Sequence, residues 1–242
     1  MESKLEKAIS IGLSMCDNTG RMAIPHIFSL FMDLAAEHGD SIGVGMNTLS
    51  QKGLFWLTVK TKVRICRRPA LLDTVTAVTW PESPGRIRCD RSYELRCGDE
   101  LLAAGKTEWA MLETATGRLA RIADAYPPSI EHCPRTACEG VYAKIPDDFT
   151  VCPEIGRYTV RSTDIDLGQH MNNAAYIHAL FGALSCQEQA AMSVCEADIL
   201  FRSSCYEGEN LSIRRRETAG GLEFGILKED GSTAAAVRIL LR

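Results

Sequence analysis

Residues 24–38 read IPHIFSLFMDLAAEH and decide the fold of the first half of the chain. Their apolar side chains recur at helical spacing, at Ile27, Leu30, Phe31 and Leu34. Pro25 suits the first turn of a helix, and Gly39 lies where a C-terminal cap would fall. Because the apolar residues occupy more than one face, the sequence predicts a helix that other elements surround.

The segment after this helix has the pattern of strands. Residues 57–65, LTVKTKVRI, alternate apolar and polar side chains, as a half-buried strand does. Further strands are predicted over residues 73–80, 86–97 and 101–112, with Pro and Gly at the turns between them. A buried helix followed by antiparallel strands indicates an α+β fold, with the helix packed on a curled sheet.

Residues 119–153 interrupt this pattern. They contain five of the nine prolines and little sustained periodicity. We interpret them as a connector across the surface, with room for a short helix around residues 137–143. The predicted domains are therefore residues 1–118 and 154–242.

The first pattern returns after the connector. Residues 16–22, CDNTGRM, match residues 165–171, IDLGQHM, which places Asp17 opposite Asp166 and Arg21 opposite His170. The elements predicted in this half are a strand, a polar loop, a helix and four strands: 157–162, 164–173, a helix through Tyr176, Leu180 and Leu184, then 198–202, 211–215, 222–228 and 233–241. An internal duplication explains this order.

The bulk composition excludes several classes of protein. A net charge of −4 and a pI near 5.8 give no support to nucleic-acid binding. No apolar run reaches the roughly 18 to 20 residues of a membrane span, and residues 1–10 lack the apolar region of a secretory signal. We expect a cytoplasmic protein. The ten cysteines include no C-x-x-C pair, so we expect mostly reduced structural thiols and no metal.

Residues 164–177, DIDLGQHMNNAAYI, concentrate the polar groups that chemistry would need. Two aspartates, a histidine and two asparagines precede an apolar helix. Asn172 or Asn173 could cap that helix, and Asp166 could stabilise its N-terminus. On these residues alone, a capping role and a catalytic role remain equally open.

This segment resembles the D-x-N-x-H-x-N-N-x-x-Y signature of the acyl-ACP thioesterases of bacteria and plant plastids, with Tyr176 at the place of the tyrosine. The first half resembles the family as well, in the D-x-x-G loop at Asp17, the Phe55-Trp56 strand start and the sequence Thr79-Trp80-Pro81. The resemblance extends over nearly the whole chain. It implies a tandem (double) hotdog fold, in which an antiparallel sheet wraps each central helix.

The resemblance also implies a site. Asp166 and His170 match the catalytic aspartate and histidine of the family. Gly168 stands where plant members have a catalytic asparagine, and Ser204 stands where many members have a glutamate, while Cys205 matches the cysteine that follows. These departures leave the identity of the general base open, with Asn172 and Ser204 as further polar candidates for a catalytic role.

The implied reaction is hydrolysis of an acyl thioester on acyl carrier protein, which releases free fatty acid and ends fatty acid synthesis. We expect Asp166 and His170 to activate a water and a backbone N–H at the start of the second helix to polarise the carbonyl. Cys205 could instead be a nucleophile or a structural thiol. The residues expected to contact the substrate are Asn173, Tyr176, Phe28, Phe31 and Trp56, although the last three could equally be ordinary core residues.

Other functions remain open at this stage. An acyl-CoA thioesterase would use the same chemistry with a different carrier, and a non-catalytic acyl-binding protein would account for Gly168 and Ser204. No metal or organic cofactor is expected. Two hotdog domains in one chain satisfy the usual dimer contact, so either a monomer or a homodimer is expected.

Overall fold

The computed structural model describes residues 4–242, and the chain divides into two compact units. The first extends to Gly140 and the second runs from Val141 to Arg242. The residues predicted to form the connector are thus divided between the units. None of the helices within residues 4–242 is long and apolar enough to cross a membrane.

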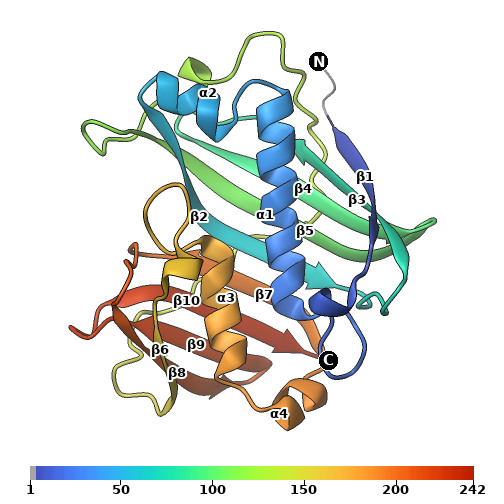
Figure 1. Cartoon of the computed structure of the whole chain (residues 1–242), viewed down its shortest axis with the longest axis vertical. Coiled ribbons are helices and arrows are strands. Elements are labelled where there is room, and N and C mark those ends of the chain that lie inside the picture. Colours follow the sequence, from blue (N-terminus) through green and yellow to red (C-terminus); the bar gives the residue numbers. More distant parts are fainter. Residues whose placement is uncertain (1–3) are drawn as a thin grey trace. The chain divides into compact units, whose positions relative to one another are not determined.

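The first unit is an antiparallel sheet packed on one long helix (Figure 1). The strands follow the order β1-β3-β4-β5-β2. Their bounds are β1 Leu5–Ser10, β2 Leu54–Ile65, β3 Thr74–Pro81, β4 Arg88–Cys97 and β5 Glu100–Glu113. The helices are α1 Ile24–Ser41 and the short α2 Met46–Gln51, with single turns at Leu13–Met15 and Ile122–Asp124.

Helix α1 is the buried helix that the sequence predicts, but it continues past the predicted end. Pro25 lies in its first turn, as expected. Gly39 is buried within the helix rather than capping it, and the positive φ that favours glycine occurs at Gly43, with a φ of 77°. The expectation of a cap at Gly39 was therefore wrong by about one helical turn.

The inner face of the sheet touches α1 closely. A Cβ atom added at Gly105 of β5 would lie 2.5 Å from Cε2 of Phe31. Phe31 also stacks on Tyr93 of β4, with ring centroids 4.7 Å apart. A glycine at position 105 therefore lets the aromatic rings of α1 and β4 pack against the sheet.

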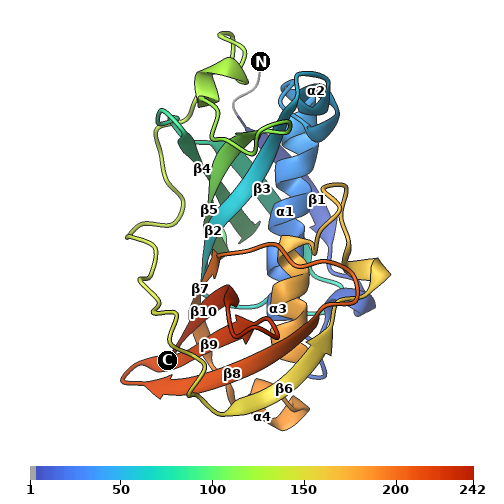
Figure 2. The same cartoon turned by 90° about the vertical axis from the view of Figure 1, so that its left-hand side faces the viewer.

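The outer face of this sheet is covered by the residues that precede Gly140. Figure 2 shows the chain after β5 on the side of the sheet opposite to α1. Ser92 Oγ accepts a hydrogen bond from the Ala137 N–H, and Trp80 Nε1 donates to the Arg135 carbonyl. Arg135 also pairs with Glu94 at 2.6 Å. This segment is therefore part of the packed unit.

The second unit repeats the arrangement. Its antiparallel strands follow the order β7-β10-β9-β8-β6. The bounds are β6 Glu154–Thr159, β7 Val194–Phe201, β8 Asn210–Thr218, β9 Gly221–Leu227 and β10 Thr233–Leu241. A single turn at Ser162–Asp164 precedes helix α3, Asn173–Gly182, and α4 covers Cys186–Ala191.

The predicted helix around residues 137–143 was wrong, because this stretch has no regular secondary structure and bends at residues 137, 138 and 140. Its backbone instead binds strand side chains, as the Ala143 N–H does with Asp198 at 2.9 Å. The residues that follow enter the core of the second unit. Phe149 is fully buried, and a Cβ atom added at Gly225 would lie 2.3 Å from its ring.

Candidate active site

A tight loop between the Ser162–Asp164 turn and α3 carries Asp166 and His170. Ile165 and Met171 form an isolated antiparallel bridge at its base. The Asp166 N–H donates to the His170 carbonyl at 3.0 Å, and the Gln169 N–H donates to the Asp166 carbonyl at 3.0 Å. Gln169 has a φ of 62°, a conformation that costs a non-glycine residue on the order of 1–3 kcal/mol. Backbone hydrogen bonds within the loop thus fix its conformation.

The side chains of Asp166 and His170 lie on the same side of this loop. Asp166 Oδ1 accepts a hydrogen bond from the Gly168 N–H at 2.7 Å. His170 Nδ1 lies 3.7 Å from the same oxygen, and the two side chains are 19% and 29% exposed for His170 and Asp166. That distance exceeds a hydrogen bond. Both groups are therefore held side by side and reachable by solvent.

Gly168 lies directly against this pair. A Cβ atom at this position would lie 2.9 Å from His170 Nε2 and 3.0 Å from Asp166 Oδ1. A side chain here would push the imidazole or the carboxylate away. The absence of a side chain at position 168 therefore leaves room for the present placement of the pair.

The start of α3 provides backbone donors beside the loop. Asn172 caps the helix, since its side-chain oxygen accepts from the Ala174 N–H at 2.8 Å. The capping role that the sequence left open is thus observed for Asn172. Neither the N–H nor the side chain of Asn173 makes a hydrogen bond with another residue of the described range 4–242. These donors are available to a ligand.

Tyr176 and Cys205 connect α3 to the loop after β7. The Cys205 N–H donates to the Tyr176 hydroxyl at 3.1 Å, and that hydroxyl donates to the Ser203 carbonyl at 3.4 Å. The Met171 N–H in turn donates to the Cys205 carbonyl at 2.7 Å. Both side chains are buried, which raises the pKa of the tyrosine hydroxyl and of the thiol. Tyr176 thus holds the segment that flanks the candidate site.

Ser204 lies in the same segment and is half-buried. Within residues 4–242 its hydroxyl forms no hydrogen bond, neither with Asp166 nor with His170. Its predicted role in catalysis stays a prediction.

Asp164 is a residue of this site whose role the sequence did not reveal. Its carboxylate accepts from the Tyr158 hydroxyl and the Arg161 N–H, both at 2.8 Å, and its carbonyl accepts from the Asn172 N–H at 2.8 Å. It therefore anchors both ends of the loop. The sequence signal for this role was the position of an acidic residue three places after Arg161, which is the spacing of a capping box.

The first unit contains the same loop without the histidine, as the internal match predicts. The Asp17 N–H donates to the Arg21 carbonyl at 2.9 Å, and the Thr19 N–H donates to Asp17 Oδ1 at 2.9 Å. These bonds correspond to those of Asp166 with His170 and Gly168. Gly20, with a φ of 70°, takes the place of Gln169. The duplication is therefore visible in the backbone hydrogen bonds.

Asp17 differs from Asp166 in its partner. Arg68 forms an ion pair with Asp17, and Thr19 Oγ1 donates to it at 2.6 Å. Burial opposes ionisation of Asp17, but the hydrogen bonds from Thr19 and Arg68 outweigh it and hold the pKa of Asp17 below its ordinary value. A carboxylate paired in this way is a poor base, so the first loop has the structure of the site without its chemistry.

The three residues predicted to contact an acyl chain lie in the first unit. Phe28 and Phe31 are buried on α1 at 3% and 0% exposure. Trp56 of β2 donates to the Val44 carbonyl at 2.9 Å and packs edge-on against Trp109 and Tyr126. These contacts are those of core residues, and the binding role stays a prediction.

The cysteines and other potential metal ligands do not converge. No disulfide joins the ten cysteines, all of which lie within residues 4–242, and four of them, Cys89, Cys138, Cys152 and Cys205, are buried. Across residues 4–242, no group of His, Cys, Asp and Glu side chains has the arrangement of a metal site.

Comparison with known proteins places both units in one family. Residues 2–129 match the family described as "Acyl-ACP thioesterase N-terminal domain", and residues 151–242 match the family described as "Acyl-ACP thioesterase C-terminal domain". Among solved structures, an acyl-ACP thioesterase from Bacteroides thetaiotaomicron superposes with a TM-score of 0.83 at 17% identity, covering 99% of this chain and 98% of that one. The 12:0-ACP thioesterase from Umbellularia californica gives 0.87 at 19% identity, covering 100% and 98%. This structural likeness shows the tandem hotdog fold.

The curated relatives are plant enzymes of greater length. The oleoyl-acyl carrier protein thioesterase of Coriandrum sativum is 28% identical over 170 residues, which are 62% of this chain and 46% of that protein. The oleoyl-acyl carrier protein thioesterase 2 of Arabidopsis thaliana is 24% identical over 236 residues, covering 89% and 64%. The chain thus spans about half to two thirds of the length of these relatives. With both of its units matched, the chain belongs to the acyl-ACP thioesterase family.

Proposed function

We propose that the protein hydrolyses an acyl thioester on acyl carrier protein and releases the free fatty acid. Asp166 carries this proposal, because its carboxylate is oriented by the Gly168 N–H, has His170 beside it and lacks the cation that neutralises Asp17. The names of the family and of its curated relatives supply the substrate class.

Asp166 and His170 act on a water molecule. Oδ1 of Asp166 is held by Gly168, while Oδ2 makes no hydrogen bond with the described residues and can accept from the water. The water attacks the thioester carbonyl carbon and passes its proton to the Asp166–His170 pair. A well-placed general base contributes roughly 10²- to 10⁴-fold to the rate. When the tetrahedral intermediate collapses, the same proton goes to the departing thiolate of the carrier.

The oxyanion of the tetrahedral intermediate needs hydrogen-bond donors. The N–H of Asn173 opens α3, where the helix dipole favours negative charge. It has no partner among residues 4–242. We assign it as the oxyanion donor, with the Asn173 side chain as a further contact to the substrate. A single donor of this kind is typically worth roughly 10²- to 10³-fold in kcat.

The acyl chain is assigned to the inner face of α1 in the first unit. Phe28 and Phe31 line this face, and Trp56 lies on a strand of the same unit. A hydrophobic chain gains about 0.8 kcal/mol for each buried methylene, so an apolar helix face suits it.

Gly168→Ala is expected to lower kcat/KM by roughly ten- to hundredfold, because a displacement of about 1 Å at a catalytic group has effects of this size. The added methyl group would meet His170 and Asp166 at about 3 Å and displace one of them. Steady-state kinetics with acyl-ACP as the substrate measures this change in kcat/KM. Full activity in this variant would show that the pair does not act in its observed placement.

Cys205→Ala is expected to keep kcat within a few-fold of wild type, because burial raises the pKa of this thiol and so disfavours the thiolate. Single-turnover hydrolysis of acyl-ACP, with release of the fatty acid as readout, measures the effect. Loss of all activity in a folded Cys205→Ala variant would require a covalent acyl-enzyme in place of direct attack by water.

The carrier is tested with one acyl chain presented on acyl carrier protein and on coenzyme A. We expect a kcat/KM at least tenfold higher for the carrier protein. Equal or greater hydrolysis of the coenzyme A thioester would make the protein an acyl-CoA thioesterase. If a full chain-length series on both carriers is bound but not hydrolysed, the protein is an acyl-binding protein.

A further inference from the structure

Arg91 is a buried cation in the first unit. It lies on β4 with 5% of its surface exposed and faces α1. Its Nη1 lies 2.8 Å from His38 Nδ1 and donates to Thr79 Oγ1 at 3.3 Å. Yet Arg91 has no ion pair with any carboxylate of residues 4–242. Burying a charge without a counter-charge costs several kcal/mol, so this arrangement indicates an anion that the chain itself does not provide.

Two further hydrogen-bonding groups lie next to Arg91 on the inner face. Tyr93 is fully buried, and its hydroxyl has no hydrogen-bond partner of normal geometry; the same is true of the buried Trp109 Nε1. Burial raises the pKa of Tyr93 to about 12, although Arg91 acts against this. The hydroxyl therefore stays protonated. Together with the guanidinium and the Trp109 N–H it forms a set of donors that the acceptor oxygens of a ligand can satisfy.

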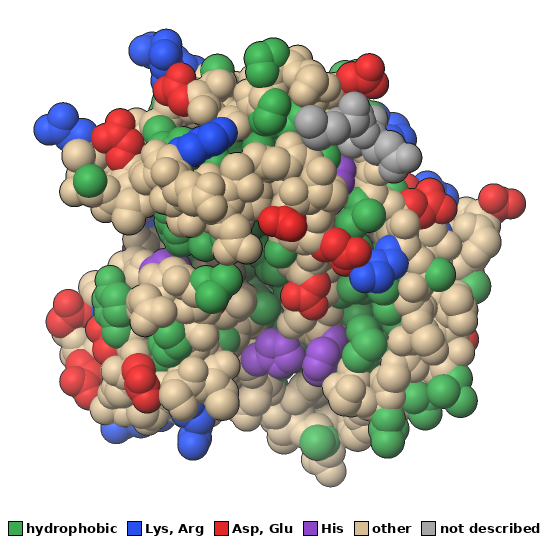
Figure 3. Space-filling model, turned by 45° about the horizontal axis from the view of Figure 1, so that its top comes forward, with side chains coloured by type: hydrophobic (Ala, Val, Ile, Leu, Met, Phe, Trp, Pro, Cys, Tyr) green, Lys and Arg blue, Asp and Glu red, His purple; other side chains and the backbone are tan. Residues whose placement is uncertain are grey.

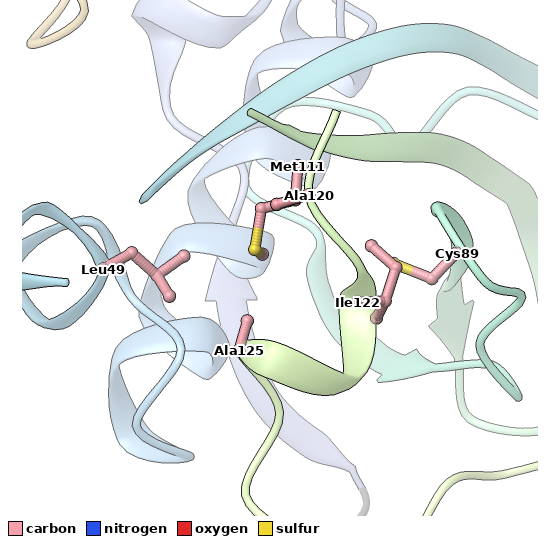
Figure 4. Packing of buried hydrophobic residues seen from close by; sticks show 6 residues of the cluster. All are labelled: Leu49, Cys89, Met111, Ala120, Ile122 and Ala125. Atoms are coloured by element: carbon pink, nitrogen blue, oxygen red, sulfur yellow. The ribbon is translucent and has the colours of Figure 1, made fainter. Parts of the chain in front are cut away.

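The wall beside these donors is apolar. Leu49, Cys89, Met111, Ala120, Ile122 and Ala125 form one buried cluster, which Figure 4 shows gathered between α2, the sheet and the Ile122–Asp124 turn. Trp109 and Tyr126 pack against this cluster. The hydroxyl of Tyr126 lies close enough to Arg91 for the guanidinium to lower its pKa, although burial raises it more strongly. The cation thus adjoins a hydrophobic surface.

Phe31 of α1 occupies the space beside Tyr93. The ring of Phe31 stacks on that of Tyr93 at 4.7 Å between centroids and fills the space above Gly105. A chain that enters along the apolar cluster would therefore end near Arg91. The group at its end would face the guanidinium, the Tyr93 hydroxyl and the Trp109 N–H.

We propose that the first unit binds acyl chains that carry a carboxylate at the end remote from the thioester, and that Arg91 binds this carboxylate. This inference rests on the proposed function for the acyl nature of the ligand. A plain alkyl end would leave the buried cation without a counter-charge and the Tyr93 hydroxyl and Trp109 N–H without an acceptor of normal geometry, whereas a carboxylate can accept hydrogen bonds from all three. Charge-assisted pairs of arginine and carboxylate are among the stronger hydrogen bonds in proteins.

Binding of two esters tests this without any turnover. Methyl decanoate and the monomethyl ester of decanedioic acid differ mainly in the remote end, which is a methyl group in one and a carboxylate in the other. We expect wild type to bind the monomethyl ester of decanedioic acid at least tenfold more tightly than methyl decanoate, as measured by calorimetry. Arg91→Met is expected to abolish or reverse this preference. Arg88→Met, an exposed arginine on the same strand, is the matched control and should retain it.

Three results would overturn the proposal: equal binding of the two esters by wild type, an unchanged preference in folded Arg91→Met, or loss of the preference in Arg88→Met. If Arg91→Met does not fold, Tyr93→Phe keeps the charge and removes one donor, and it should reduce the preference several-fold. Should no acyl thioester be hydrolysed, the proposed activity fails, while these binding measurements still decide the role of Arg91.

Discussion

Asp166→Asn is expected to lower kcat/KM for hydrolysis of acyl-ACP by at least about a hundredfold, which lies in the range for loss of a general base. An amide retains the size of the carboxylate and can still accept from the Gly168 N–H, whose bond to Asp166 Oδ1 is 2.7 Å long. It cannot take a proton from water. The change therefore removes the general base and preserves the conformation of the loop. Initial rates of fatty acid release measure the effect.

The matched control for this variant is Asp17→Asn in the corresponding loop of the first unit. Asp17 is held by Thr19 and Arg68, so its replacement should affect stability and leave the rate constant for hydrolysis within a few-fold of wild type. Comparable losses of activity in both variants, with the fold intact, would contradict the assignment of the site to the second unit.

Phe149→Ala is expected to lower the free energy of unfolding by about 3–5 kcal/mol, as typical for loss of a buried aromatic ring. Phe149 is 0% exposed and packs over Gly225, and the Arg216 guanidinium lies 4.5 Å from the ring centroid. Removal of the ring leaves a cavity over a glycine, which has no side chain to fill it. Urea unfolding followed by circular dichroism measures the change.

Val151→Ala is the control, since Val151 lies two residues away and is 88% exposed. Its replacement should change stability by less than about 0.5 kcal/mol, as at other exposed sites. A similar small effect of Phe149→Ala would show that this segment is not part of the core of the second unit.

The elements with strong periodicity could be predicted from the sequence. The alternating residues 57–65 lie within β2, and the apolar residues 24–38 lie within α1. The edge strand β1 was missed, because half of its sequence LEKAIS is polar and most of it is exposed. The helix α4 was missed because it is six residues long. Phe149 was assigned to a surface connector, since a segment without regular structure gives no periodic signal of burial.

The candidate site was only partly accessible to sequence reasoning. Asp166 and His170 were identified through the resemblance to the family signature, and the structure places them within one loop. The contact of Gly168 with His170 depends on the positive φ of Gln169, which no local pattern predicted. The burial of Arg91 follows from its position on β4, where it faces α1, and no local pattern in the sequence indicates it. Such contacts between distant elements become visible only in three dimensions.

The most direct test of the account compares His170→Ala with Arg21→Ala, the same change at corresponding positions of the two loops. Fatty acid released from acyl carrier protein is quantified for both variants beside wild type, with circular dichroism to establish folding. We predict a loss of at least about a hundredfold for His170→Ala and a rate near that of wild type for Arg21→Ala. Equal rates for the two variants, or an inactive wild type, would contradict the central claim that the loop of the second unit catalyses thioester hydrolysis.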